Sequence, residues 1–363
     1  MNRHTKPLLA ALLVAVAALA GGAGTTPILA AEAVQADPPG DSPRARTAKN
    51  QITILYDAFG RDRSLKKDWG FSALIEVSGK RILFDTGNNA EIFSHNATAM
   101  GVDLTNLDFV VISHRHGDHI GGLNYLLNVN PTVPIYVPKE NFGVFGSSLP
   151  GTFYRRNEVL PSEMRYFDGE PPETLRFGTP WPQAKFTWVS SSIEVAQGFH
   201  LIVLKGSWGV DLDVMEMSLA IDTPEGVVLV VGCSHPTIER IVEAAKTVTG
   251  RPIQVVLGGL HLLPAKDEEI QRISAALHDT WKVEWIAPAH CTGEPAFAML
   301  RKIFGDRYLY AGLGTTIVLD RNPRSEDQRH EATASLESMD LTYDLDARLA
   351  AEGEASSVGL GSP

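Results

Sequence analysis

The sequence has 363 residues, of which 44% are hydrophobic, with 43 acidic against 32 basic side chains. This apolar content is sufficient for a packed core and excludes a chain that is disordered throughout. The net charge of −11 makes polyanionic nucleic acid an unfavourable partner. The expected partner is a small-molecule substrate, and the composition leaves the oligomeric state open.

Residues 1–33 have the composition of a secretory signal peptide. Arg3 and Lys6 precede an apolar stretch over 8–20, which is followed by small residues. This stretch is too short to span a membrane comfortably, and a retained anchor is the alternative. We expect a periplasmic or secreted protein without stable membrane insertion after cleavage. A linker rich in Pro, Asp, Gly and Arg is expected over 34–50.

Strands and helices alternate in the first half of the expected domain. Alternating or continuous apolar runs between turn residues indicate strands, and longer segments with helical spacing indicate helices. The expected elements are strands over Gln51–Tyr56, Phe71–Val77 and Arg81–Phe84, a helix over Ala90–Met100, a short strand over Phe109–Ile112 and a helix over Ile120–Leu127.

Residues 139–183 are rich in Gly, Pro, Arg and aromatic residues without clear periodicity, which indicates an insertion over the active site. The polar tail over 321–363 is expected to be disordered. Between them we expect strands Lys185–Ser190 and Phe199–Leu204, a hairpin of Met217–Asp222 and Val227–Val231, helix Thr237–Thr247, strand Ile253–Leu257, helix Asp267–Trp281 and strand Val283–Ala287.

The segment Ser113–His119 places three histidines and an aspartate directly after a short apolar strand. In an extended chain His114 and His116 project to one side, while Asp118 and His119 can turn toward a second position. Imidazoles beside a carboxylate suit zinc, iron or manganese. The segment therefore predicts a site for two divalent transition metals, with zinc as the first expectation.

Further histidine-bearing motifs each follow an expected strand. They are Gly232-Cys233-Ser234-His235-Pro236, Gly258-Gly259-Leu260-His261-Leu262 and Ala289-His290-Cys291-Thr292-Gly293. Together with the Asp-Thr-Gly turn at Asp85 and the pattern His-x-His-x-Asp-His, they resemble the metallo-β-lactamase-fold hydrolases. They are similar to one branch in particular, the 7,8-dihydropterin-6-yl-methyl-4-(β-D-ribofuranosyl)aminobenzene 5′-phosphate synthases.

This resemblance extends from about residue 52 to about residue 319. It implies an α/β fold, the four-layer αββα sandwich of the metallo-β-lactamase fold, for a domain over 51–320. It also implies that His114 and His116 bind the first metal, whereas Asp118, His119 and His290 belong to the second. Asp118 would in addition orient a metal-bound hydroxide and accept its proton.

The sequence departs from the common family pattern at the bridging ligand. Many members carry an aspartate where this chain has Cys233. Either Cys233, as a thiolate, or His235, two residues later, completes the metal shell, and we prefer His235. A disulfide between Cys233 and Cys291 is a further alternative, because disulfides form readily in exported proteins and this chain has two cysteines.

Two more residues have expected roles near the metals. His261 follows a glycine pair that allows close backbone approach, so it contacts the substrate or protonates a leaving group, with a packed loop histidine as the alternative. Asp85 is expected to orient a ligand imidazole rather than to bind metal. Surface or core positions are expected for His95, His200 and His278. Core packing is expected for Trp69, Trp181 and Trp208, with lining of a pocket as the alternative.

These features predict an exported metallohydrolase that uses a metal-bound hydroxide on an ester, phosphoester or lactone. One alternative is the synthase reaction of the branch, which joins an arylamine ribose phosphate to a dihydropterin pyrophosphate. Export disfavours it, because such intermediates belong in the cytoplasm. The other alternative is a metal-binding protein without turnover, which the presence of Asp118 beside a complete histidine set disfavours.

Overall fold

The computed structural model covers the predicted domain and a few residues on either side of it. The predicted signal peptide, nearly all of the predicted linker and the end of the chain lie outside the described residues. Within these residues, none of the helices has the length and apolar character needed to cross a membrane. The described residues are 49–140, 147–150, 156–177, 181–207 and 213–325.

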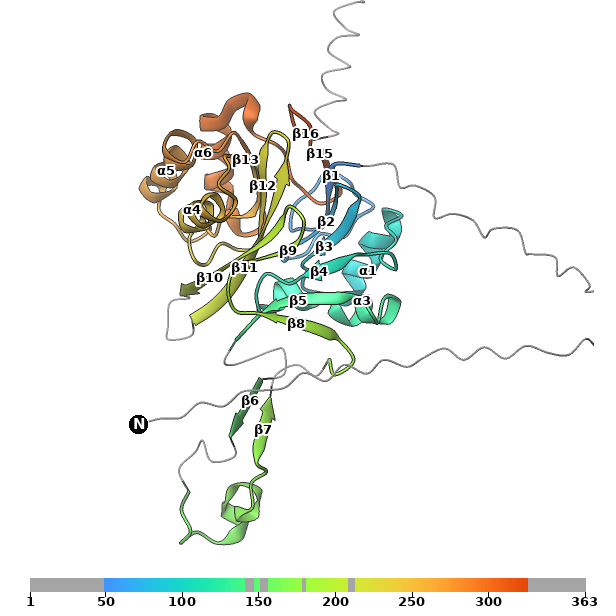
Figure 1. Cartoon of the computed structure of the whole chain (residues 1–363), viewed down its shortest axis with the longest axis vertical. Helices are drawn as coiled ribbons and strands as arrows, with labels where there is room; N and C mark the ends of the chain where they lie inside the picture. The colour runs from blue at the N-terminus through green and yellow to red at the C-terminus, as the bar shows by residue number, and fades with distance from the viewer. Residues whose placement is uncertain (1–48, 141–146, 151–155, 178–180, 208–212, 326–363) are drawn as a thin grey trace, which may run out of the picture. The chain divides into compact units, whose positions relative to one another are not determined.

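The first sheet has eight strands in the order β16-β15-β1-β2-β3-β4-β5-β8 (Figure 1). Its strands from β15 to β3 pair antiparallel, and those from β3 to β8 pair parallel. The bounds are β1 (Gln51–Tyr56), β2 (Ser72–Val77), β3 (Lys80–Phe84), β4 (Phe109–Val111), β5 (Pro134–Pro138), β8 (Lys185–Val189), β15 (Thr316–Val318) and β16 (Arg324–Ser325).

The second sheet has six strands in the order β14-β13-β12-β11-β10-β9. The strands from β9 to β12 form an antiparallel meander, and β12, β13 and β14 are parallel. The bounds are β9 (Ile193–Ala196), β10 (Phe199–Ser207), β11 (Asp213–Thr223), β12 (Gly226–Val231), β13 (Ile253–Gly259) and β14 (Trp285–Ala289).

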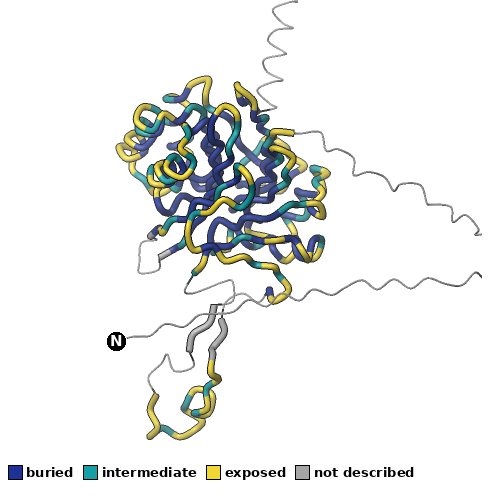
Figure 2. The backbone as a smooth tube through the Cα atoms, in the orientation of Figure 1, coloured by how far each residue is buried: buried dark blue, intermediate teal, exposed yellow. Residues whose placement is uncertain are grey.

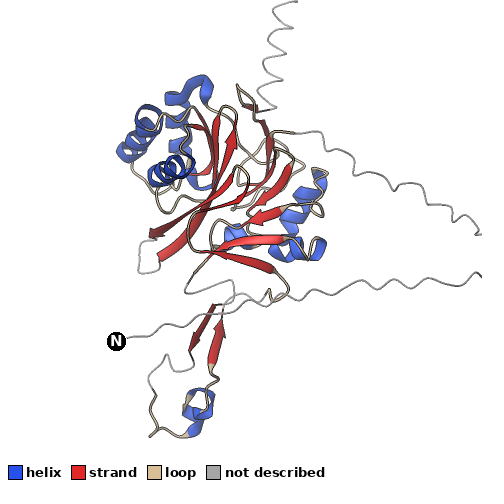
Figure 3. Ribbon diagram, viewed as in Figure 1, coloured by secondary structure: helices blue, strands red, loops and turns tan. Residues whose placement is uncertain are grey.

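Helices cover the outer face of each sheet (Figure 3). On the first sheet these are α1 (Ala90–Ala99) and α3 (Leu123–Val129). On the second sheet they are α4 (Ile238–Thr249), α5 (Asp267–Ala275) and α6 (Glu294–Phe304). The sequence did not predict α6.

Three hydrophobic clusters lie between the four layers. In β12, Val228 and Val230 face the first sheet, whereas Val227, Leu229 and Val231 face the helices. Every residue of β12 is therefore buried, as Figure 2 shows for the strands of the interior. A strand buried on both faces appears in sequence as a continuous apolar run.

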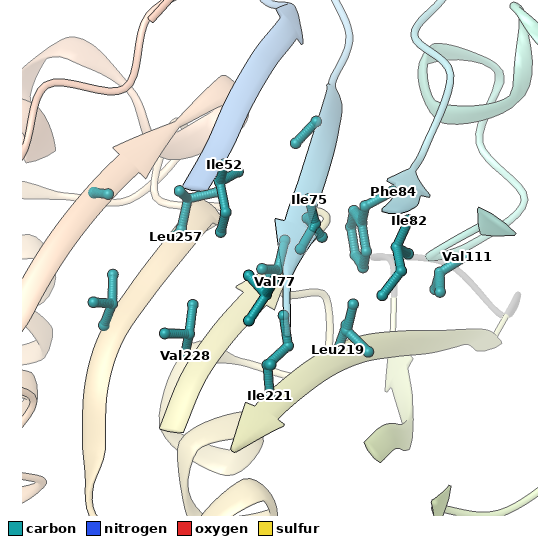
Figure 4. Close-up of a cluster of buried hydrophobic side chains, with 14 of the residues drawn as sticks. Ile52, Ile75, Val77, Ile82, Phe84, Val111, Leu219, Ile221, Val228 and Leu257 are labelled. Carbon is teal, nitrogen blue, oxygen red and sulfur yellow. The ribbon is translucent and has the colours of Figure 1, made fainter. Parts of the chain in front are cut away.

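The cluster between the two sheets holds them together. Figure 4 shows side chains of the first sheet, such as Ile75 and Phe84, against Leu219 and Ile221 of the second. Each fully buried side chain of this size contributes about 1.5–3 kcal/mol to folding. The fold is the predicted αββα sandwich.

Two predicted helices differ from the structure. The helix expected over Ile120–Leu127 is divided into α2 (Gly117–Ile120) and α3, with two glycines between them. A Cβ at Gly121 would lie 2.0 Å from Asn88 O, and one at Gly122 would lie 2.2 Å from Thr86 O. These glycines let the segment after His119 pack closely against the Asp-Thr-Gly turn and Asn88. This close packing interrupts the helix between α2 and α3. The helix expected over Asp267–Trp281 is shorter in the structure. Helix α5 ends at Ala275, and a wider π-helical turn follows over Ala276–Thr280.

The predicted insertion over 139–183 is described only in part. Within it β6 (Ser147–Pro150) and β7 (Thr174–Phe177) form a two-stranded antiparallel sheet. Its role over the active site stays a prediction. At the other end, beyond the predicted boundary at 320, β16 pairs with β15 and Ser325 is fully buried, while the domain bounds themselves stay a prediction.

Candidate metal centre

The predicted ligands gather where parallel strands of both sheets end. Parallel strands present their carboxyl ends at one edge, which is where α/β sheets bind ligands. Each of the following residues lies within three positions of the end of its strand: Asp85 after β3, His114 after β4, Cys233 after β12, His261 after β13 and His290 after β14.

The backbone of these loops is unusual. Asp85, Ser234, His261 and His290 all have positive φ, between 47° and 67°. This left-handed conformation is costly for residues with a side chain and is found where surrounding contacts enforce it, often at functional sites. In this chain it occurs in loops that carry the predicted ligands and in the Asp-Thr-Gly turn.

The first donor set consists of His114, His116 and His235. One ring nitrogen from each lies within 4.8 Å of the others. His114 Nε2 is 3.0 Å from His116 Nδ1, a separation that suits two ligands of one metal ion. Both ring nitrogens of His235 are buried and have no hydrogen-bond partner among the described residues.

The second donor set consists of Asp118, His119 and His290. Asp118 Oδ2 is 3.3 Å from His290 Nε2 and 3.8 Å from His119 Nε2. These three side chains also offer donor atoms within 4.8 Å of one another. The predicted division of the motif between two positions therefore agrees with the geometry.

Cys233 and His235 occupy different places in this arrangement. His235 joins the first set, while Cys233 Sγ lies 3.2 Å from His119 Nε2 of the second. The sulfur of Cys233 also lies within 4.8 Å of a ring nitrogen of His114 in the first set, so it lies between the two sets. The two candidates for the bridging ligand are therefore not exclusive, and the thiol of Cys233 holds the position between the sets.

The cysteines are not joined in this structure. Cys233 and Cys291 are both buried free thiols, so the predicted alternative of a disulfide is not observed. Their sulfur atoms and a ring nitrogen of His261 form a third group within 4.8 Å. His261 is thus brought to the centre, where its ring centroid is 4.4 Å from that of His235.

The electrostatics of the first set favour neutral imidazoles, the form that binds metals. Burial and the neighbouring histidines place the pKa of His114 well below its ordinary value. Burial lowers the pKa of His116 to about 4 and that of His235 to about 3. The buried ring nitrogens of His235, which have no hydrogen-bond partner among the described residues, are energetically costly unless a cation or hydrogen-bond donor satisfies them. The donor set therefore fits a divalent transition metal.

Comparison with known proteins places this arrangement in a family. A model of the metallo-beta-lactamase superfamily matches residues 70–200. The 7,8-dihydropterin-6-methyl-4-(beta-D-ribofuranosyl)-aminobenzene-5'-phosphate synthase of Methanocaldococcus jannaschii is 30% identical over 285 residues, which cover 72% of this chain and 94% of that protein. The chain belongs to the metallo-beta-lactamase superfamily.

Two further relatives show different extents of similarity. The crystal structure of a metal-dependent hydrolase of the beta-lactamase superfamily has a TM-score of 0.57 and 25% identity, and the match covers 74% of this chain and 99% of that chain. An anti-Pycsar protein of Paenibacillus xerothermodurans is 29% identical over 109 residues, or 28% of this chain and 42% of that protein. Metallo-beta-lactamase proteins are generally enzymes, and their fold implies divalent metal binding.

Asp85 has the position expected of a residue that orients a metallo-beta-lactamase ligand. Its Oδ2 is 2.7 Å from His119 Nδ1, which leaves Nε2 directed at the second set. The same carboxylate accepts hydrogen bonds from Ser113 N and Ser113 Oγ at 2.7 Å each. Although burial opposes it, the charge of Asp85 raises the pKa of His119 to about 9. Metal binding at Nε2 must therefore displace a proton from this ring.

Glu216 was not predicted from the sequence. This buried carboxylate of β11 accepts hydrogen bonds from the backbone N–H groups of Cys233, Ser234 and His235 at 3.0, 2.7 and 2.7 Å. Burial raises the pKa of Glu216 to about 7 in the absence of metal. Glu216 is the one acidic residue in the largely apolar run 214–221, and this isolated carboxylate is the available sequence signal. Glu216 fixes the loop that carries Cys233 and His235.

Asp57 has the equivalent role beneath the last ligand, and the sequence analysis also missed it. It lies directly after β1, is fully buried, and accepts a hydrogen bond from His290 N at 2.9 Å. Burial raises the pKa of Asp57 to about 7. Like Asp85, it follows a buried strand, and this position is the available sequence signal.

The tryptophan predictions hold in part. Trp181 is buried as predicted, but Trp69 is 41% exposed and its ring centroid is 5.0 Å from that of His290, so it borders the centre. Trp208 lies outside the described residues. The three histidines predicted to lie outside the site have partners away from the metal centre. His95 contacts Ser64, His200 contacts Asp222, and His278 contacts Asp279.

Proposed function

We propose that this metallo-beta-lactamase protein is a metal-dependent hydrolase acting on an ester, phosphoester or lactone. The observation that carries the proposal is the pair of adjacent three-donor sets with Cys233 between them. A similar solved structure is described as a metal-dependent hydrolase. Incubation of the metal-loaded protein with chromogenic phosphodiesters, phosphomonoesters and lactones tests it, and absence of turnover on all of them contradicts it.

Two divalent ions held by these sets would supply Lewis acidity, which would lower the pKa of a water molecule toward neutrality. The chain then provides the remaining functions. Asp118 is one-fifth exposed and lies within the second set, so its carboxylate can orient the attacking water and accept its proton. His261 is half-buried beside His235, and its hydrogen bond with Cys291 raises its pKa, which suits a proton donor to the leaving group.

Zinc is our proposal for both ions. The first set offers nitrogen alone, and the second offers nitrogen and oxygen with the sulfur of Cys233 beside it. Zinc accepts all three donor types in four-coordinate sites, whereas manganese prefers oxygen-rich ones. Elemental analysis of protein purified without added metal checks this, and iron or manganese in place of zinc would contradict it.

The synthase reaction is the second candidate, because the synthase of Methanocaldococcus jannaschii is covered over 94% of its length. A direct assay separates the two candidates. The protein is given an arylamine ribose phosphate and a dihydropterin pyrophosphate, and the coupled product is sought by mass spectrometry. Formation of this product together with inactivity on every hydrolytic substrate would move the synthase ahead of the hydrolase.

His235→Ala and Cys233→Ala are expected to remove metal from different sets. His235→Ala should lose most of one metal equivalent, as should His116→Ala, because each leaves the first set with two ligands. Cys233→Ala should keep the first ion and weaken the second, whose ligand His119 lies 3.2 Å from the thiol. Metal content after dialysis against a weak chelator is the measurement. Equal losses in His235→Ala and Cys233→Ala would contradict separate sets.

We also propose export, with cleavage near Ala31 or Ala33. The proposal rests on the charged start, short apolar stretch and small residues of 1–33. Expression of the full chain followed by intact-mass measurement on the envelope or medium fraction should find a mature form without residues 1–30. Protein that stays in the cytoplasm with these residues attached would contradict the proposal.

A further inference from the structure

The two cysteines of the chain meet inside the metal centre. They are the only cysteines in the sequence. Cys291 follows the ligand His290 and Cys233 follows β12, and both thiols are buried and free. Their sulfur atoms lie within 4.8 Å of each other, and Cys291 Sγ also donates a hydrogen bond to Cys233 O at 3.6 Å. Two thiols this close can be joined by a disulfide after small side-chain and backbone adjustments.

A glycine makes this contact possible. A Cβ at Gly259 would lie 2.8 Å from Cys291 Sγ and 2.4 Å from Gly232 O. Without that atom, the loop after β14 approaches the loop after β12 closely enough for the sulfurs to meet. The proximity of Cys233 and Cys291 therefore follows from three loops packed together, not from one flexible segment.

Cys233 has two competing neighbours. On one side its Sγ lies 3.2 Å from His119 Nε2 of the second donor set. On the other side lies the thiol of Cys291. A sulfur shared in a disulfide has no thiolate with which to bind a metal, and a metal-bound thiolate is withdrawn from disulfide chemistry. The two states of Cys233 therefore exclude each other.

We propose that Cys233 and Cys291 form a redox-modification site, where a peroxide joins the pair in the metal-free protein and bound metal prevents it. The protective part rests on the metal centre of the proposed function. Hydrogen peroxide oxidises one thiol to a sulfenic acid and is reduced to water. The second thiol then attacks the sulfenic sulfur, a second water leaves, and a disulfide remains. The oxidised chain has lost the Cys233 thiol that lies between the two donor sets.

The first test uses the metal-free full chain. Treatment with hydrogen peroxide should lower its intact mass by two hydrogen atoms, remove both titratable thiols, and yield a proteolytic fragment that links Cys233 to Cys291. Because the chain has no other cysteine, any intramolecular disulfide is this one. Cys291→Ser is the matched control and should show no such mass loss. Thiols that stay free, or gain oxygen without cross-linking, would overturn the proposal.

The second test measures the link to metal. Oxidised protein should take up fewer metal equivalents than reduced protein, and dithiothreitol should restore the uptake. At free metal about one hundred times its dissociation constant, disulfide formation should slow about a hundredfold, because only the metal-free fraction reacts. Equal rates with and without metal would overturn the proposal. No arm uses catalytic activity, so failure to find a hydrolysed substrate leaves this test intact.

Discussion

Asp118→Asn is expected to lower kcat by about 10²–10⁴ at saturating metal, a typical range for a positioned acid–base group. Asparagine keeps the shape of the side chain but cannot accept a proton from water. Burial alone would raise the pKa of Asp118, yet the imidazole of His290, whose Nε2 is 3.3 Å from Asp118 Oδ2, and that of His119 lower it below its ordinary range. The carboxylate is therefore ionised and ready to act as the acceptor.

The measurement is kcat and KM on the best hydrolytic substrate, with metal content determined on the same samples. KM should change much less than kcat, because the substitution removes an interaction made in the transition state. Asp279→Asn is a matched control, since Asp279 also contacts a histidine, His278, but lies on the surface. An Asp118→Asn protein that holds both metals and retains full activity would show that Asp118 is not the proton acceptor.

Local patterns in the sequence predicted the strands and the histidine motif, and the family resemblance carried by these motifs predicted the sandwich fold. Apolar runs bounded by turn residues located most strands of the sandwich. The candidate ligands from His114 to His119 follow one strand. Their division between two positions could be inferred from the alternation of side chains along an extended segment. The later ligands His235 and His290 were found in the same way, each just past a strand.

The choice between Cys233 and His235 could not be made from spacing, since it depends on the path of a three-residue loop. Ser234 has φ of 67°, so the chain turns between the two candidates and directs them to different donor sets. An extended loop would have placed both side chains on one face. The sequence analysis recognised neither the left-handed backbone of Ser234 nor the carboxylate of Glu216 beneath the loop.

Two elements, β5 and α6, were not predicted from the sequence. β5 has proline at both ends, which is unusual for an interior strand, so no strand was predicted there, yet β5 pairs with β4 and β8. α6 begins directly after the ligand loop, with Pro295 in its first turn, where proline is tolerated. Its buried residues, among them Leu300 and Phe304, pack in the hydrophobic cluster between the second sheet and its helices.

Glu216→Ala is expected to have the largest effect on stability, with a loss of about 3–5 kcal/mol in the free energy of unfolding. Its two oxygens accept three buried backbone hydrogen bonds, and a buried donor left without an acceptor costs about 1–3 kcal/mol. Relaxation of the loop should recover part of the sum. The same loosening displaces Cys233 and His235 together, so both donor sets should bind metal more weakly.

Denaturant unfolding of the metal-free protein measures the loss without a contribution from metal binding. Glu216→Gln should be intermediate, because its carbonyl oxygen can replace one carboxylate oxygen while its amide hydrogens face the remaining N–H. Glu225→Ala, at an exposed acidic residue of the β11–β12 turn, should stay within about 0.5 kcal/mol of the unsubstituted protein. If Glu216→Ala were equally mild, the carboxylate would not be what holds the loop. In that case the positions of Cys233 and His235 would have to depend on the strand ends and on the metals themselves.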